Sequence, residues 1–216
     1  MIRDLSWVDP LYLLFALRWT ILLTLLALVG GAPIGLLVAS LGNTANPSTR
    51  LVSRAYIGLV QGIPLLAWLF LFFFGFPIFG IDVPAWLAAT CAFSVYAGAF
   101  LGEIWRGALM SIPKTQWEAS SSIGMSYIAQ LRYVIIPQAI RIATPPTVGF
   151  VMQLVKNTSL AAVIGFVEVT REGQMTAAAT LAPLSVYAMV GAFYFALCYP
   201  LTVYSRRLER RLHVAR

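Results

Sequence analysis

The sequence predicts an all-α, polytopic integral membrane protein with about five transmembrane helices. Of its 216 residues, 60% are hydrophobic and 11% are charged, whereas soluble domains average about 25% charged residues. Five stretches are long and apolar enough to cross some 30 Å of bilayer hydrocarbon, which takes about 20 helical residues. The 16 glycines and 12 prolines fall largely inside these stretches, where bilayer helices tolerate them. A soluble fold is therefore excluded.

The predicted spans follow one another in a single transmembrane domain, residues 1–216. Hydropathy places them at 11–41, 56–79, 84–106, 143–166 and 183–205. The amino terminus carries acids and a proline where a secretory signal would carry a basic stretch and an apolar core, so we expect no cleavage. Between the third and fourth spans lies a more polar loop, residues 107–142.

The basic residues predict the orientation of the chain, because short cytoplasmic loops retain Lys and Arg. Five spans put the two termini on opposite sides of the membrane. With the carboxyl terminus inside, the cytoplasmic segments hold eleven of the 15 basic residues: Arg50, Arg54, Arg106, Lys114, Arg132, Arg141, Arg206, Arg207, Arg210, Arg211 and Arg216. We therefore expect the amino terminus outside and the carboxyl terminus in the cytoplasm. The net charge of +7 then reflects the orientation of the chain in the membrane. It does not indicate a nucleic-acid partner.

The polar loop contains signals for two short helices joined by a glycine turn. Pro113 suits the start of a helix, and residues 116–122 can form the first one. Gly124 then allows a turn, residues 126–134 can form the second helix, and Pro137 is expected to end it. On periodicity alone, this unit could be an amphipathic hairpin that only anchors the loop at the membrane surface.

Segments along most of the chain resemble the permeases of importer-type ABC transporters. Glu118-Ala119, with Gly124 six positions after the glutamate and then Ile136-Pro137, is similar to the cytoplasmic EAA loop of those permeases. The likeness is greatest to the polar amino acid permease family. It continues in QGIPLLAWLFLFFFG at 61–75, AFLGEIWRGALMSIPKTQWEAS at 99–120, VIIPQAIRIATPP at 134–146, LVKNTSLAAVIGFVEVTREGQ at 154–174 and YSRRLERRL at 204–212.

This resemblance implies a permease subunit of an ATP-binding-cassette importer in the bacterial inner membrane. The implied partners are two ABC ATPase subunits, a homologous permease or a second copy of this chain, an extracytoplasmic amino-acid-binding protein and membrane lipid. The residues implied to couple the chain to the ATPase are Glu118, Ala119, Gly124, Ile136 and Pro137. Ser120 replaces the second alanine of the EAA pattern, and Gln61 stands where an arginine is often found. These departures put only the details of the ATPase contact in doubt.

A polar cluster inside the fourth span predicts where a solute could be held. Lys156 lies well within the span, and an ionisable group at that depth costs at least ~2.5–3.5 kcal/mol unless it finds water or a partner. Asn157, Thr158 and Ser159 favour caps over continuous helix, so we expect a break, with a half-helix starting near Ser159. Its free N–H groups would attract an amino acid carboxylate. Alternatively, Lys156 pairs with a glutamate on another helix.

Other polar residues near the spans are weaker candidates for the solute pathway. Gln153 lies three residues before Lys156 and can share its helix face. Glu103 and Arg106 are also three apart, which favours a structural ion pair over contact with solute. The family usually has aspartate where this chain has Asn157, so a role for that acid does not transfer.

Enzyme chemistry is not predicted. The sequence has no GxxxxGK[ST] phosphate cradle, and with His213 as its one histidine it offers no HExxH metal site and no Ser–His–Asp triad. We expect no cofactor and no metal. The alternative is a stand-alone carrier or channel for small polar solutes, but such a carrier would use acids within its spans, and Glu103 is the only acid identified near one.

The family implies a polar L-amino acid as the substrate. The positive charge of Lys156 adds a lean toward acidic or neutral solutes such as glutamate, aspartate or glutamine. We expect the separate binding protein to set most of the selectivity.

Overall fold

The computed structural model describes residues 3–213, with side chains up to residue 210. Within that range the chain is helical and contains no strand, which confirms the all-α prediction. Its helices are α1 (Asp9–Gly42), α2 (Pro47–Gly62), α3 (Leu65–Ile78), α4 (Ala85–Met110), α5 (Lys114–Ser122), α6 (Tyr127–Gln130), α7 (Ile136–Asn157), α8 (Val169–Thr180) and α9 (Pro183–His213). Two irregular helical segments, η1 (Leu131–Ile135) and η2 (Thr158–Ile164), flank α7. Arg216 and the side chain of Arg211, both used in the orientation prediction, lie outside the described residues.

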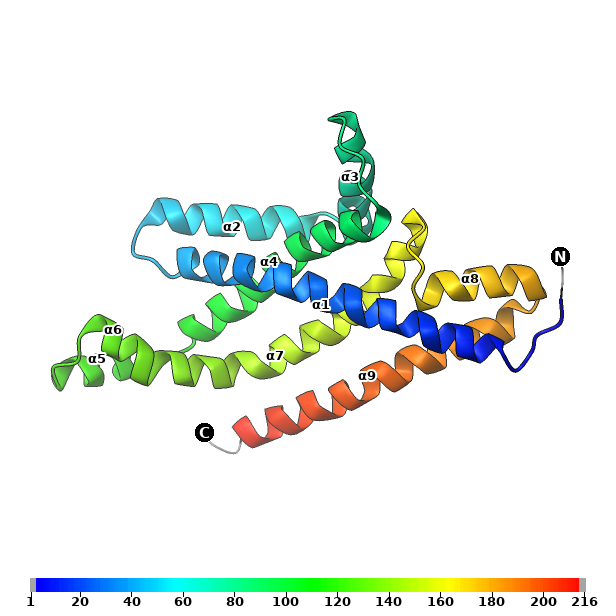
Figure 1. The fold of residues 1–216 in the computed structure, drawn as a ribbon. Helices are drawn as coiled ribbons and strands as arrows, with labels where there is room; N and C mark the ends of the chain where they lie inside the picture. Colours follow the sequence, from blue (N-terminus) through cyan, green and yellow to red (C-terminus); the bar gives the residue numbers. More distant parts are fainter. Residues whose placement is uncertain (1–2, 214–216) are drawn as a thin grey trace.

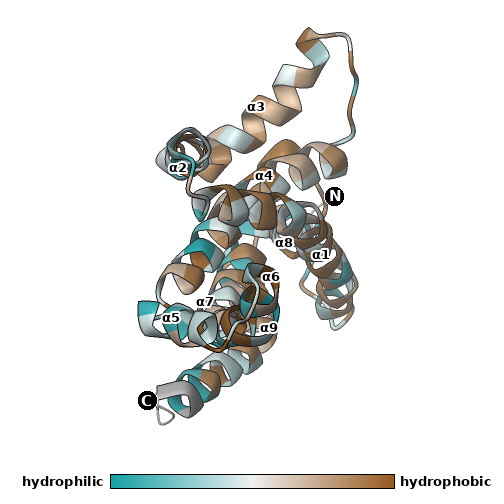
Figure 2. Cartoon of the chain, turned by 90° about the vertical axis from the view of Figure 1, so that its left-hand side faces the viewer, coloured by the Kyte–Doolittle hydropathy of each residue, from teal (hydrophilic) through white to brown (hydrophobic). Residues whose placement is uncertain are grey.

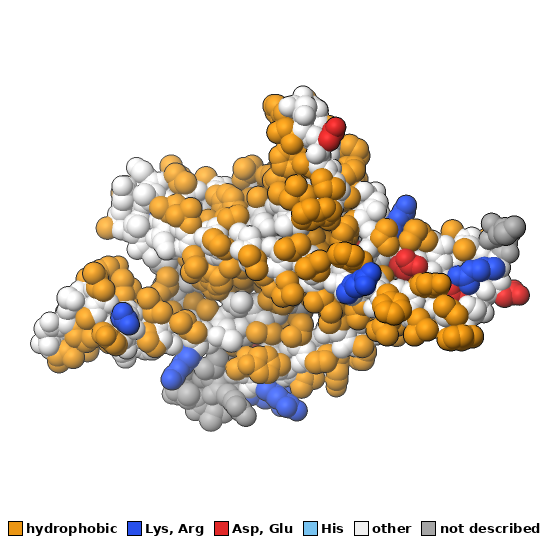
Figure 3. All heavy atoms as spheres, in the orientation of Figure 1, with side chains coloured by type: hydrophobic (Ala, Val, Ile, Leu, Met, Phe, Trp, Pro, Cys, Tyr) orange, Lys and Arg blue, Asp and Glu red, His pale blue; other side chains and the backbone are white. Residues whose placement is uncertain are grey.

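Long apolar helices run side by side through most of the molecule (Figure 1). Among the described residues, four continuous helical stretches are long and apolar enough to span a membrane: Asp9–Gly42, Ala85–Met110, Tyr127–Ile164 and Pro183–Arg210. A fifth candidate is the pair α2 and α3, whose axes differ by 94°. Hydrophobic side chains cover much of the face seen in Figure 3. This exposed apolar surface is what a lipid-facing protein requires.

The second predicted span, 56–79, is not one straight helix. The chain bends between α2 and α3, where Ile63 has an extended backbone (φ −108°, ψ 133°). Proline disfavours helical geometry in the residue before it, so Pro64 forces Ile63 out of the helix. As a result, α3 projects away from the neighbouring helices (Figure 2). Of its aromatic side chains, Phe74 is exposed, whereas Trp68, Phe70, Phe72 and Phe73 pack in part against the main core.

Glycines let α1 and α4 approach each other closely along their length. A Cβ atom at Gly31 would lie 2.6 Å from the Cβ of Ala97, and one at Gly35 would lie 2.9 Å from the Cβ of Leu101. A glycine of α4 allows the same close approach to α1, since a Cβ at Gly98 would lie 2.5 Å from a side-chain methyl of Ile34. Small residues of this kind are how membrane helices gain packing contact without a hydrophobic driving force.

The helix that contains the fourth predicted span begins well before that span. Residues 127–164 form a single helical run, so the helix end predicted at Pro137 is wrong. Pro137 lies in the first turn of α7, directly after the π-helical turn Leu131–Ile135. A π turn rearranges the backbone hydrogen bonds locally, and the first turn of a helix does not need the N–H that proline lacks.

Candidate functional site

The predicted hairpin is a packed unit at the ends of α4 and α7. Its buried side rests on a small apolar core of Ile112, Ile135 and Ala139. The ring of Trp117 on α5 stacks on that of Tyr127 on α6, with centroids 6.0 Å apart. Nε2 of the buried Gln130 donates to Ser121 Oγ and to the Met125 carbonyl, both at 2.9 Å. The hairpin can therefore move as one body with the long helices that carry it.

The opposite side of the hairpin is exposed and mixes apolar and charged side chains. Glu118 and Ala119 on α5, two of the residues expected to couple the chain to an ATPase, are both exposed. Ile123 and Ile128 are each 76% exposed beside them. Gly124 adopts φ +77°, a left-handed conformation that most other residues avoid, and this turn reverses the chain between α5 and α6.

Ile136 and Pro137 belong to α7, which follows the hairpin in the chain. Both are exposed in the first turn of α7, beyond the π turn. Ile136 also lines an apolar cavity of about 500 Å³ formed with residues of α1 and α4, among them Ala39 and Trp105. The five predicted coupling residues therefore divide into a hairpin group, Glu118 to Gly124, and an α7 group.

The predicted solute residues form a polar stripe on α7. Lys156 and Asn157 lie three and four residues after Gln153, which puts both of them next to Gln153 on one side of the helix. Gln153 and Lys156 are exposed in the single chain, and Asn157 lies near the hydroxyl of Tyr96 on α4. The aromatic rings of Tyr96, Phe100 and Phe150 stack beside the stripe at centroid distances of 4.5 to 6.2 Å.

The break predicted after Lys156 takes a different form from the one expected. The chain passes directly from α7 into the 3-10 helix Thr158–Ile164, and the Thr158 N–H bonds to the Leu154 carbonyl. The predicted half-helix with free N–H groups is therefore wrong. The hydroxyls of Thr158 and Ser159 each donate at 2.7 Å to carbonyls of the preceding turn. Thr158 is fully buried, so its side chain does not face a solute.

Glu103 forms the ion pair that its spacing predicted. Arg106 donates to both carboxylate oxygens, Nε to Oε2 at 2.9 Å and Nη2 to Oε1 at 2.7 Å. Glu103 lies seven residues along α4 from Tyr96, about 10 Å by helical rise. The pair is therefore separate from the Lys156 stripe.

Sequence reasoning missed Glu168, a fully buried acid just after η2. Its Oε1 accepts the N–H groups of Thr170 and Arg171 at the start of α8, at 2.8 and 3.1 Å. Its Oε2 accepts the hydroxyls of Tyr194 on α9 at 2.7 Å and of Thr20 on α1 at 3.3 Å. This carboxylate already neutralises the N-terminus of α8, so that helix end is not free to bind a solute anion. The span prediction ended at 166, two residues before it.

Comparison with known proteins identifies the family. Residues 31–214 match the family described as binding-protein-dependent transport system inner membrane component. The chain belongs to this family. A probable amino-acid ABC transporter permease protein, YckA of Bacillus subtilis (strain 168), is 34% identical over 93% of this chain and 88% of its own length. The glutamine transport system permease protein GlnP of Escherichia coli (strain K12) is 33% identical over 91% of each chain.

Solved structures agree with this assignment. A chain from the crystal structure of an amino acid ABC transporter with histidines superposes with a TM-score of 0.87 and 29% identity, covering 97% of this chain and 100% of that one. A MetNI methionine ABC transporter chain has the same fold, with a TM-score of 0.71 at 20% identity and coverage of 95% and 96%. The resemblance drawn from the EAA loop is thus confirmed. The chain is a multi-pass inner-membrane permease of the ABC importer type.

Proposed function

We propose that this chain is the permease subunit that carries polar L-amino acids through an ABC importer. The observation that carries the proposal is the family match over residues 31–214, joined to a rigid, exposed hairpin at one end of a bundle of spans. Relatives named for glutamine and L-cystine transport support a polar amino acid as the solute.

In the proposed mechanism, two ATPase subunits hold the hairpins of two permease copies or homologues. Exposed Glu118 offers a carboxylate to a basic residue of the ATPase, and the exposed Ile123 and Ile128 supply apolar contact. Because the hairpin is packed onto the ends of α4 and α7, its displacement moves both helices. ATP hydrolysis on the partner would then open and close the pair of permeases alternately.

The solute would pass along the polar stripe of α7. Lys156 is exposed in the single chain. A lysine at membrane depth needs water or an anionic partner, and the carboxylate of an amino acid supplies one. The amides of Gln153 and Asn157 can bond the polar side chain of the solute. We propose a preference for acidic or neutral amino acids on this basis.

Reconstitution in liposomes tests the proposal. The chain alone should transport no labelled glutamine, whereas the chain with its ATPase and an amino-acid-binding protein should show uptake that depends on ATP. ATP-independent uptake by the chain alone would establish the alternative, a stand-alone carrier. A purified assembly that contains no ATPase would also overturn the importer assignment.

A further inference from the structure

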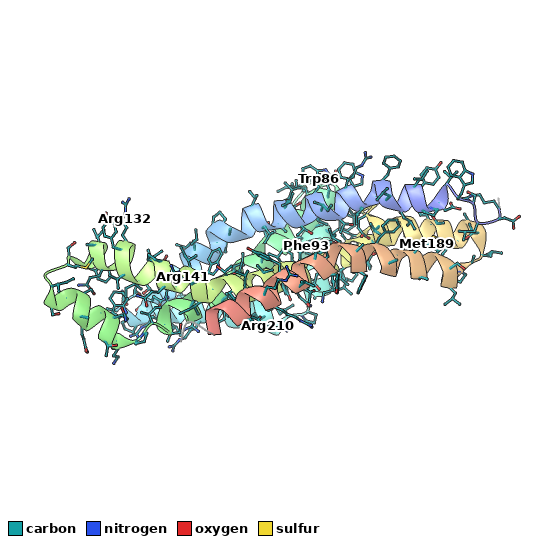
Figure 4. All side chains as sticks on the ribbon, turned by 90° about the horizontal axis from the view of Figure 1, so that it is seen from below. Trp86, Phe93, Arg132, Arg141, Met189 and Arg210 are labelled. Atoms are coloured by element: carbon teal, nitrogen blue, oxygen red, sulfur yellow. The ribbon has the colours of Figure 1, made fainter. Side chains whose placement is uncertain are left out.

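A groove at one end of α1 and α4 has no role in the path just proposed. It has a volume of about 640 Å³, within the range of ~300–1,000 Å³ typical of sites for small organic ligands. Its walls come from α1, from the first turns of α4 and from the segment after η2, including Trp19, Leu22, Leu26, Trp86, Thr90 and Phe166. Figure 4 shows Trp86 beside α1.

The depth of the groove in the membrane follows from the helix lengths. The backbone of Gly42 packs against Arg106, so these residues mark the same level at the hairpin side of α1 and α4. Trp86 lies 20 residues from Arg106 and Trp19 lies 23 from Gly42, about 30 and 35 Å at 1.5 Å per residue. With Gly42 and Arg106 placed at the hairpin-side interface, a hydrocarbon layer ~30 Å thick ends near both tryptophans, at the opposite interface where such rings concentrate.

The lining of the groove excludes an amino acid as its occupant. Apart from the indole N–H groups of Trp19 and Trp86, Thr90 is the only polar side chain of the lining, and its hydroxyl already donates to the Trp86 carbonyl at 2.8 Å. No lining side chain is charged, so a zwitterion would lose its water without gaining a charged partner for its ammonium or carboxylate group. An acyl chain makes no hydrogen bonds to water, so it can enter this groove without losing any.

The Arg18 side chain places a positive charge beside Trp19, which lines the groove. The Arg18 guanidinium carbon lies 5.2 Å from the centroid of the Trp19 ring, and the side chain is exposed. Among residues 3–210, Arg18 forms no ion pair. At the interface, phosphate groups are the anions within reach, and a guanidinium bonds them through two N–H groups at once.

We propose that this groove binds an anionic phospholipid of the leaflet opposite the hairpin, with one acyl chain between Trp19 and Trp86 and the phosphate on Arg18. Phe166, which lines the groove, is part of the segment between η2 and Glu168. The ring of Phe166 meets that of Trp19 edge to face, with centroids 6.4 Å apart. A bound lipid would thereby brace the segment that follows the polar stripe.

Native mass spectrometry of the full chain, in micelles with equal amounts of phosphatidylglycerol and phosphatidylcholine, tests the proposal. Wild type should retain at least threefold more phosphatidylglycerol. Arg18→Gln should abolish this preference, and Leu26→Trp, which fills the groove, should lower retention of both lipids at least twofold. Arg54→Gln removes one exposed charge on α2, away from the groove, and should match wild type.

Two results would overturn the proposal. One is an unchanged lipid preference in Arg18→Gln. The other is high-yield self-crosslinking of Leu22→Cys in a chain whose Cys91 and Cys198 are replaced by alanine, because the groove would then be an interface between two copies. Circular dichroism of each variant verifies that the helices are intact.

Discussion

The Glu168 carboxylate joins α1 to α8 and α9, the last two helices of the chain. Its two oxygens accept from the start of α8, from Thr20 on α1 and from Tyr194 on α9. In Glu168→Ala, these donors would be buried without partners, at a cost of ~1–3 kcal/mol for each group left unsatisfied. We expect a clear fall in the melting temperature of the purified chain.

Glu168→Gln is the matched control for that variant. Its amide oxygen can still accept hydrogen bonds, so the loss of stability should be less than half that of the alanine variant. Equal melting temperatures for wild type and Glu168→Ala would show that the carboxylate does not hold the helices together.

Lys156 should matter for the affinity of transport and not for the fold. In Lys156→Gln, the reconstituted importer should need at least ~10-fold more amino acid for half-maximal uptake, which corresponds to about 1.4 kcal/mol. Arg54→Gln, which removes an exposed charge elsewhere, should leave the concentration dependence unchanged. If both variants behave alike, the α7 stripe is not where the solute carboxylate binds.

The sequence predicts the polar residues of the path but not what their side chains do. Thr158 and Ser159 favour local backbone bonds, and their hydroxyls make such bonds. These residues can be accommodated by a break in the α-helix or by a 3-10 turn. The packing of Thr158 against other helices decides between the two structures, and no local sequence pattern encodes that packing. Glu168 is missed for a similar reason, because its partners lie 148 and 26 residues away.

The contact between α1 and α4 can be tested with single methyl groups. In Gly31→Ala, the new Cβ would lie 2.6 Å from that of Ala97, and overpacking of this kind costs ~1–3 kcal/mol. Gly58→Ala adds the same methyl group to α2 where no atom lies within 4 Å. Thermal denaturation in detergent should show a lower melting temperature for the first variant alone. A normal melting temperature for Gly31→Ala would mean that the two helices are less closely packed.

The hairpin turn should control coupling and not assembly. Gly124→Val places a β-branched residue at φ +77°, which costs roughly 1–2 kcal/mol and distorts the turn that presents Glu118. We expect ATPase activity in the reconstituted importer to persist while uptake falls severalfold. Gly107→Val, on α4 with open space around it, should leave both rates nearly unchanged. Unchanged uptake in Gly124→Val would refute the coupling role.

Element boundaries follow from the sequence only where local chemistry decides them. Gly124 turns the chain as predicted, because only a residue without a Cβ takes that conformation easily. Pro137 was expected to end a helix but begins α7, since the π turn before it accommodates the missing N–H. The bend at Pro64 had a local signal in the proline itself. Hydropathy obscured it, because both arms of the bend are apolar.

The orientation of the whole molecule is the remaining condition for the importer mechanism. The hairpin and the amino terminus lie at opposite ends of the bundle (Figure 1), and the basic residues predict that the hairpin end is cytoplasmic. In a chain with alanine at Cys91 and Cys198, a membrane-impermeant maleimide should label Ser185→Cys in intact spheroplasts. It should label Ser122→Cys, at the exposed end of α5, only after permeabilisation. The reverse pattern would place the hairpin outside, beyond reach of an ATPase in the cytoplasm.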